Sequence, residues 1–246
     1  MTSLTPSRAG LARALSKMGY CSRSAAFRSI REGKVSVNGT IQRDPERPVS
    51  WQRDRIEVEG RVVAAPAKVY LMLNKPRGVV TTASDEKGRK TVYAGLDANL
   101  PWVGPVGRLD KASEGLLLLT NDSEWAARVL APETHLSKTY HVQIATVADQ
   151  PLLKTLIRGV ASSDGGVLRA KAARLLRSGS KNSWLEIVLD EGKNRQIRRM
   201  LDACGVEVLR LMRVAIGPLT LGELAKGDWR FLTKEEKRGL DSAMTR

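Results

Sequence analysis

An aspartate and an arginine stand directly before a leucine run in the stretch VGPVGRLDKASEGLLLLTND, residues 103–122. Three glycines, at positions 104, 107 and 115, bracket Asp110. Glycine permits tight or left-handed backbone that can lift one side chain clear of its surroundings. Asp110 therefore either acts on a substrate or simply caps a turn and pairs with Arg108 or Lys111. The leucines after Gly115 would anchor the turn in a core.

A helix rich in arginine could place a cation beside the Asp110 carboxylate. In EGKNRQIRRMLDACG the apolar residues fall on one helical stripe, and Arg195, Arg198, Arg199 and Asp202 fall on the other. Burial would raise the pKa of Asp110, and a nearby cation would offset that effect. Arg198 is the candidate for this cation. Arg195 and Arg199 belong either to a solvated face or to a surface that contacts the substrate.

Tyr140, in the alternating stretch KTYHV, is a third candidate. A tyrosine on such a strand is commonly a core residue. Its ring can also stack against a flat group of a substrate, and its hydroxyl can act as a general acid or general base. Alternation places His141 on the opposite face, so we leave it out of the site.

The composition favours a polyanionic partner. The chain has 246 residues, 41 Lys and Arg against 26 Asp and Glu, and a formal net charge of +15. Nucleic acid is the leading candidate. The longest apolar runs are too short for a membrane span, and the first residues do not read as a signal peptide, so we expect a cytoplasmic protein without membrane contact. Two separated cysteines and two histidines supply a metal site poorly, and we expect chemistry without metal or cofactor.

Residues 8–60 predict a small α/β domain of their own. Two short helices, the second capped by Ser22, precede strands that alternate around Asn38-Gly39, a strong hairpin signal. Basic residues crowd the helices, where they form a solvated face or bind phosphate. The candidates for RNA contact are Arg13, Lys17, Arg23, Arg28 and Arg31.

A linker is expected at residues 61–68 and a second domain at 69–238. Strand-like runs outnumber helices there, which predicts an α+β fold with a mainly antiparallel mixed sheet and flanking helices. Lys75 and Arg77 flank Pro76 and form either a charged turn or a clamp on the RNA backbone. Trp102, Trp184 and Trp229 sit beside apolar strand residues, so we expect them to pack in the core.

Two motifs resemble known families. GLARALSKMGYCSRSAAFRSIREGKVSVNG is similar to the S4 RNA-binding domain. GRLDKASEGLLLLTND resembles the signature of RsuA-type ribosomal RNA pseudouridine synthases, and the likeness extends to LNKPRGVVTT, KTYHVQI and EGKNRQIRRML.

The resemblance to pseudouridine synthases implies a reaction, the conversion of uridine to pseudouridine, and roles for individual residues. In that family the aspartate of GRLD is the nucleophile, an arginine at the position of Arg198 pairs with it, and a tyrosine stands at the position of Tyr140. These three residues would be catalytic. Independently of the resemblance, Arg108 either positions the loop or contacts phosphate, and the other candidates for contact with RNA are Lys75, Arg77, Arg195 and Arg199. The partner would be ribosomal RNA or an assembling ribosomal particle, and the protein a monomer.

Several alternatives stay open at this point. The wording SEGLLLLTN is closer to the large-subunit members, and a small-subunit target is the alternative. A non-catalytic ribosome-assembly factor would explain the charge, but it gives no reason for Asp110, Tyr140 and Arg198 together. A DNA-binding protein lacks a convincing recognition-helix dimer.

Overall fold

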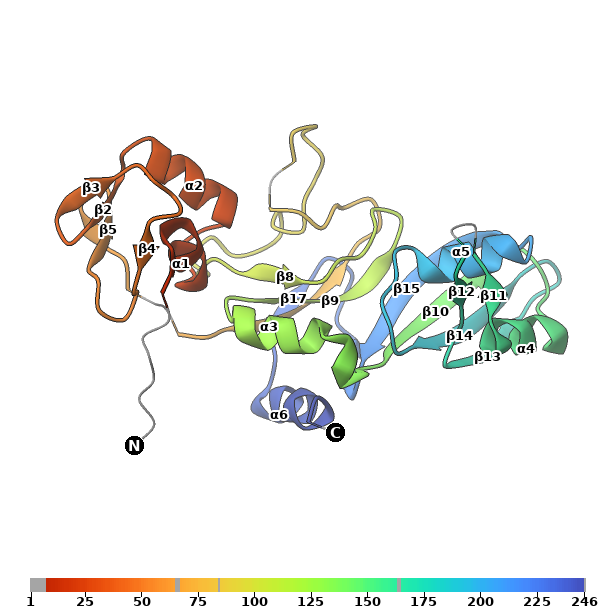
Figure 1. Cartoon of the computed structure of the whole chain (residues 1–246). Helices are drawn as coiled ribbons and strands as arrows, with labels where there is room; N and C mark the ends of the chain where they lie inside the picture. Colours follow the sequence, from red (N-terminus) through yellow and green to blue (C-terminus); the bar gives the residue numbers. More distant parts are fainter. Residues whose placement is uncertain (1–7, 65–66, 84, 163–164, 246) are drawn as a thin grey trace. The chain divides into compact units, whose positions relative to one another are not determined.

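The computed structural model of the chain describes residues 8–64, 67–83, 85–162 and 165–245. The chain divides into two compact units, one formed by residues 1–70, 97–104 and 119–124 and the other by residues 71–96, 105–118 and 125–246. Residues 1–7 and positions 65 and 66 of the predicted linker lie outside the described ranges. Both units combine helices with mainly antiparallel sheets, which confirms the predicted α+β class (Figure 1). In the described ranges, no helix is long and apolar enough to cross a membrane.

The first unit contains two helices and a small antiparallel sheet. Ser22 caps the second helix by accepting a hydrogen bond from the backbone N–H of Ala25 at 3.1 Å. Asn38 and Gly39 adopt left-handed φ angles of 52° and 81°, as the hairpin signal predicts. The sheet order is β3-β2-β5-β6, and a separate pair joins β1 to β4. The elements are β1 (Ala9–Gly10), α1 (Leu11–Lys17), α2 (Arg23–Arg31), β2 (Val35–Val37), β3 (Thr40–Gln42), β4 (Pro48–Val49), β5 (Ile56–Val58) and β6 (Arg61–Val62).

Two elements of the structure extend across predicted borders, one at the start of the linker and one at the end of the second domain. Arg61 and Val62 pair with β5, so these two residues belong to the small sheet and not to a linker. At the other end, a boundary at residue 238 would cut through α6 (Lys234–Ala243), whose capping box at Thr233 and Glu236 marks a complete helix start.

The second unit is built on a nine-stranded sheet. Its order is β13-β14-β10-β15-β9-β7-β17, with β16 added to β15 and β8 added to β9. The pair β9 and β15 is parallel, whereas β10 is antiparallel to both of its neighbours. The strands are β7 (Tyr70–Lys75), β8 (Gly104–Val106), β9 (Glu114–Thr120), β10 (Lys138–Ile144), β13 (Ala172–Ser178), β14 (Ser183–Leu189), β15 (Val208–Ile216), β16 (Leu219–Thr220) and β17 (Trp229–Phe231), with a separate pair β11 (Val160–Ala161) and β12 (Val167–Leu168).

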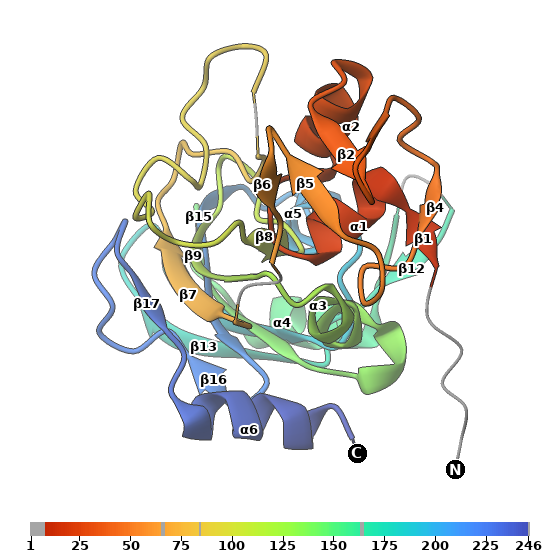
Figure 2. The same cartoon turned by 90° about the vertical axis from the view of Figure 1, so that its left-hand side faces the viewer.

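Helices pack on this sheet in two groups. Apolar residues of α4 (Gln150–Arg158) and α5 (Gln196–Ala203) join those of β10, β14 and β15 in one buried cluster. In the other group, Trp125 of α3 (Ser123–Leu130) donates its indole N–H to Asp241 of α6 at 2.9 Å. Figure 2 shows α6 beside β16. A short 3-10 helix, η1 (Pro132–Thr134), follows α3. The α5 helix thus packs beside β15, the strand next to β9, into which the Asp110 loop leads.

Candidate active site

Asp110 lies in the loop between β8 and β9, and two glycines allow the turns at its ends. Gly107 and Gly115 have φ angles of 73° and 102°, which favour glycine, whereas Gly104 is not left-handed. A Cβ on Gly115 would lie 2.3 Å from the carbonyl oxygen of Arg213. Glycine at position 115 therefore lets β9 approach β15 closely.

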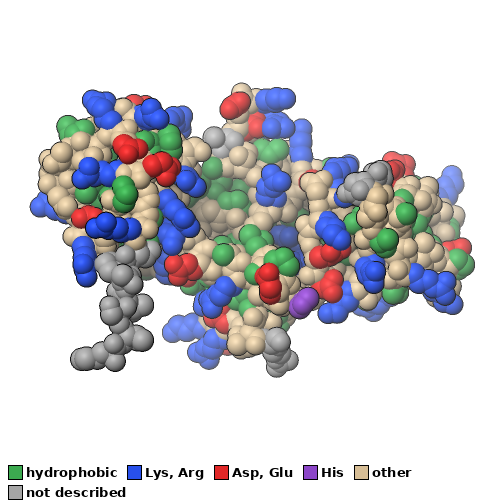
Figure 3. Space-filling view, viewed as in Figure 1, with side chains coloured by type: hydrophobic (Ala, Val, Ile, Leu, Met, Phe, Trp, Pro, Cys, Tyr) green, Lys and Arg blue, Asp and Glu red, His purple; other side chains and the backbone are tan. Residues whose placement is uncertain are grey.

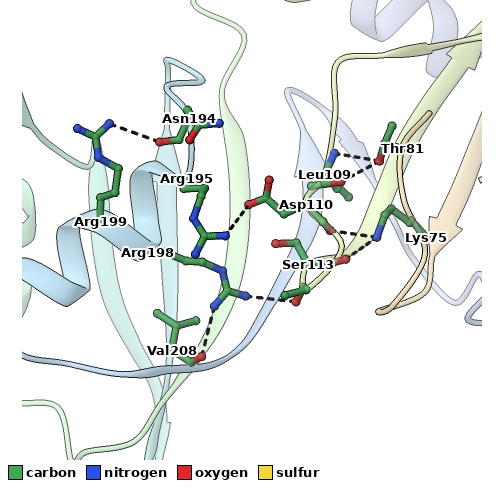
Figure 4. A network of polar contacts seen from close by, with 11 residues as sticks. Lys75, Thr81, Leu109, Asp110, Ser113, Asn194, Arg195, Arg198, Arg199 and Val208 are labelled. Atoms are coloured by element: carbon green, nitrogen blue, oxygen red, sulfur yellow. Dashed lines mark hydrogen bonds and ion pairs between the residues drawn. The ribbon is translucent and has the colours of Figure 1, made fainter. Parts of the chain in front are cut away.

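The backbone of this loop is held by hydrogen bonds at five successive carbonyls, from Leu109 to Ser113. Figure 4 shows the bonds from the side chains of Lys75, Thr81 and Arg198. Thr81 donates to Leu109 at 2.8 Å, and the backbone N–H of Gly78 donates to Lys111 at 2.7 Å. The remaining three carbonyls receive side-chain donors: Lys75 reaches Asp110 at 3.2 Å and Ser113 at 2.8 Å, and Arg198 reaches Ala112 at 3.2 Å. A loop fixed in this way presents one side chain in a defined place without further ordering of its backbone.

Lys75 has a different place from the one predicted. Its side chain is fully buried, and its ammonium donates to the carbonyls of Pro76, Asp110 and Ser113. The predicted clamp on the RNA backbone is therefore wrong, because no part of the ammonium is left for solvent or RNA. Burial lowers the pKa of Lys75 to about 8, and the nearby charges of Asp110 and Glu114 oppose this shift. Lys75 supports the loop from within the protein.

The carboxylate of Asp110 is more open than predicted. Its side chain is 39% exposed, and one oxygen lies 3.7 Å from the guanidinium of Arg195. The sequence predicts Arg195 either on a solvated face or on a surface that contacts the substrate. In the structure, Arg195 precedes α5 with a left-handed φ of 48°, an unfavourable conformation for a residue with a side chain. This conformation starts the helix at the point where the guanidinium reaches Asp110 (Figure 4).

Arg198 does not form the predicted ion pair with Asp110 within the described part of the chain. Its guanidinium donates instead to the carbonyls of Ala112, in the loop, and Val208, at the start of β15, at 3.2 and 3.4 Å. Burial and the positive charges of Arg195 and Arg77 lower the pKa of Arg198, and the charge of Asp110 opposes them. Arg198 thus joins the Asp110 loop to the sheet and contributes positive charge to its surroundings.

Tyr140 lies on β10, in the same row of the sheet as the end of the loop. It pairs with Arg213, which in turn pairs with Gly115 of β9. Neighbouring strands are about 4.8 Å apart, so Tyr140 stands about 10 Å across the sheet from Gly115. Its side chain is half-buried and packs against the same apolar cluster as α5. It therefore lies on the face from which Arg198 approaches.

The three remaining candidates for RNA contact near Asp110 differ in where they lie. Arg77 is exposed and donates to the carbonyl of Leu209 at 3.4 Å, close enough to affect Arg198. Arg108 is exposed on the loop. Arg199 points away from Asp110, toward the carbonyl of Asn194 (Figure 4) and the hydroxyl of Ser162. Of these three, Arg199 is the residue that the structure separates from the site.

A buried ion cluster next to the loop was missed by the sequence analysis. The carboxylate of Glu114 is 2% exposed and lies 2.7 Å from Arg210 and 2.8 Å from Lys226. Burial alone would raise the pKa of Glu114, but the hydrogen bonds from both cations outweigh it and hold the pKa below its usual value. An acid directly before a glycine and four leucines was the available signal, since a buried carboxylate needs partners.

The predicted RNA-contacting residues of the first unit differ in how free they are. Arg13, Arg28 and Arg31 are exposed. Lys17 lies 5.1 Å from the ring centroid of Trp51, and Arg23 lies 3.5 Å from Glu46. Lys and Arg side chains stand out over the surface of this unit in Figure 3. This distribution suits contacts with phosphate groups.

The first unit also has a polar pocket that the sequence analysis did not find. It has a volume of about 280 Å³. Its carboxylate, Asp54, accepts from the backbone N–H of Ser50 at 2.7 Å and from Asn38 at 3.0 Å. These bonds lower the pKa of Asp54. The lining includes three arginines with no ion pair in the described ranges: Arg8, Arg47 and Arg53.

Comparisons with known proteins agree with this layout. Residues 69–203 match the family described as RNA pseudouridylate synthase, and residues 10–66 match the S4 domain. A Bacillus subtilis protein named ribosomal large subunit pseudouridine synthase B is 40% identical over 94% of this chain and 94% of its own length. An Aquifex aeolicus protein named as an uncharacterized RNA pseudouridine synthase is 40% identical over 94% of this chain and 92% of its own. A crystal structure of a pseudouridylate synthase aligns with a TM-score of 0.66 and 31% identity over 94% of this chain and 99% of that one.

Proposed function

Because this chain belongs to the RNA pseudouridine synthase family and carries an S4 domain, we propose that it converts uridine to pseudouridine in ribosomal RNA, with Asp110 as the nucleophile. We further propose a large-subunit target, which the name of the Bacillus subtilis relative supports. The observation that carries the proposal is the loop itself. Five bonded carbonyls hold the backbone around a carboxylate that remains open to a substrate.

The reaction suits the residues near Asp110. Isomerisation breaks the bond between ribose C1′ and uracil N1, turns the base, and forms a bond from C1′ to C5, while the C5 proton leaves and N1 is protonated. The atoms balance within the nucleotide. Asp110 would either add to the sugar or base, or remove a ribose proton while the base departs. Arg195, which contacts the carboxylate, and Arg198, which is bonded to the loop, place positive charge beside Asp110, where the RNA brings negative charge.

Tyr140 would contact the uracil after it leaves the RNA stack. A flipped base needs a flat partner, and its proton transfers need a general acid or base. The first unit would supply affinity through phosphate contacts of Arg13, Arg28 and Arg31. The open state of Asp110 fits this division, since the RNA itself would cover the carboxylate when it binds.

The test is Asp110→Asn, which hardly changes the side-chain volume. We expect tritium release from RNA labelled at uridine C5 to disappear while RNA affinity is retained. Asp202→Asn, which alters an exposed carboxylate on α5, is the matched control and should leave turnover unchanged. Turnover by Asp110→Asn would refute the assignment of the nucleophile. Mapping pseudouridines in both ribosomal RNAs, with and without the gene, tests the large-subunit target.

A further inference from the structure

The half of the large sheet that carries α4 and α5 has a second face. Leu185 and Ile187 of β14 are buried in the cluster with the helices, so alternation places Trp184 on the opposite side. A cavity of about 390 Å³ lies there, called the Trp184 groove below. It is lined by His141, Leu176, Arg177, Trp184, Arg210 and Met212. Tyr140 and α5 lie on the other face, so this groove is separate from the Asp110 site.

The groove combines an aromatic ring with two guanidinium groups. The guanidinium carbon of Arg177 lies 5.2 Å from the ring centroid of Trp184, and that of Arg210 lies 5.6 Å from it. Beside them Leu176 is 38% exposed and adds an apolar side chain to the lining of the groove. Nucleic-acid bases stack on aromatic rings and on guanidinium planes, and this stacking tolerates any base. The groove therefore has the chemistry of a base-stacking surface.

The charges around the groove are positive and only partly neutralised. Arg210 is held by the buried carboxylate of Glu114 at 2.7 Å. The nearest acid on β14, Glu186, is already bonded to Arg174 at 2.6 Å. Arg177 has no carboxylate partner in the described ranges of the chain. One guanidinium thus stays available for a phosphate next to a stacked base.

We propose that the Trp184 groove binds an unpaired nucleotide of RNA, with the base against Trp184 and its phosphate at Arg177. This inference rests on the proposed RNA substrate and adds a contact outside the catalytic site. It also replaces the expectation that Trp184 is a core residue. An apolar protein partner fits less well, because it would bury the charge of Arg177 without an anion, which is costly.

The direct test observes Trp184 in the full chain. Five tryptophans give five resonances after labelling with 5-fluorotryptophan, and Trp184→Phe identifies the one from Trp184. A short oligoadenylate is the probe, since it contains no uridine for the catalytic site. We expect its addition to shift the Trp184 resonance. A Trp184 resonance that stays in place at saturating oligoadenylate would overturn the proposal.

Affinity measurements provide the second test. Trp184→Leu keeps an apolar side chain and should weaken oligoadenylate binding by roughly tenfold, whereas Trp184→Phe keeps a stacking ring and should bind nearly as the parent does. Arg177→Ala should lower the slope of log affinity against log salt by about 0.7, the value for one phosphate on a single strand. Arg158→Ala is the matched control, because this exposed arginine lies on α4, on the opposite face. Equal effects of Arg158→Ala and Arg177→Ala would overturn the proposal.

Two outcomes separate this inference from the proposed function. Tritium release at saturating ribosomal RNA should be the same for Trp184→Leu and the parent, since the groove contacts no reacting group. If the parent released no tritium, the proposed function would fail while the oligoadenylate result would still stand on its own. If the Trp184 resonance moved with protein concentration and not with RNA, the groove would be a contact between copies of the chain, and the inference would be wrong.

Discussion

Lys75 should make stability and activity respond in opposite directions to alkaline pH. Its buried ammonium has a pKa of about 8, below the usual value of 10.5. Between these two values the unfolded chain keeps the proton and the folded protein releases it. The folded protein then binds fewer protons than the unfolded chain, so its free energy of unfolding rises with pH in this interval. The difference of about 2.5 between the two values corresponds to about 3 kcal/mol in total, or about 1.4 kcal/mol for each pH unit.

Activity should fall over the same interval. A neutral amine carries one proton fewer and no charge, so it holds the carbonyls of Asp110 and Ser113 less strongly than the ammonium does. The loop around Asp110 would then lose part of its order. We expect kcat for tritium release to decline above about pH 8, with a smaller change in KM, because the loop is involved in the reaction and not in RNA affinity.

The assay compares the parent with Lys75→Met from about pH 7 to about pH 9.5. Urea unfolding of both proteins gives the contribution of Lys75 as their difference, which should change by about 2 kcal/mol in favour of the parent over this interval. Other groups that titrate near pH 9 affect both proteins and cancel. A constant difference in unfolding free energy, together with a flat kcat for the parent, would refute the role given to the Lys75 ammonium.

Three further predictions concern other parts of the structure. Arg198→Met should lower the free energy of unfolding by about 2 kcal/mol, because it leaves two carbonyls without a donor. Arg195→Met changes an exposed side chain and should act mainly on turnover. Urea unfolding measures the first effect, and tritium release measures the second. Glu114→Gln should lower the free energy of unfolding by about 2 kcal/mol at neutral pH. The difference between variant and parent should shrink as pH falls through the lowered pKa of Glu114, and urea unfolding at a series of acidic pH values measures it. Arg47→Ala should reduce the salt slope of RNA binding by about 1, while Arg55→Ala, whose guanidinium already pairs with Glu57 at 2.7 Å, should leave the slope unchanged.

Local signals predicted most of the fold. The Ser22 cap and the Asn38-Gly39 hairpin depend on neighbouring residues, and both are present. The two-residue strands β1, β4 and β6 were missed, because strands of this length are defined by their partners and have no period of their own. The end of the chain was misread for a similar reason. The apolar side of α6 is a single turn around Leu240, which packs only in the tertiary structure.

The site was predictable in its members but not in its contacts. Spacing predicts Arg195, Arg198 and Arg199 on one side of a helix; in the structure Arg198 and Arg199 lie in α5, and Arg195 directly precedes it. It could not show that the left-handed backbone at Arg195 turns this residue toward Asp110 and leaves Arg198 to bond the loop. Lys75 was misread because a lysine beside proline and glycine is usually exposed. The carbonyls of Asp110 and Ser113, from a distant part of the chain, join that of the adjacent Pro76 around the ammonium and reverse that expectation.

In this site the loop supplies a fixed backbone, and the Asp110 carboxylate supplies a side chain that can still turn. Five bonded carbonyls fix the backbone from Leu109 to Ser113 before any RNA arrives, so little conformational entropy remains to be lost there on binding. The Asp110 side chain itself is held only by a contact of 3.7 Å with Arg195 and can still turn toward a substrate. Loss of a loop donor should therefore reduce kcat with little change in KM. Loss of an exposed arginine that does not contact Asp110, such as Arg13 or Arg77, should instead raise KM, since such a residue contributes to binding of the RNA and not to the order of the loop.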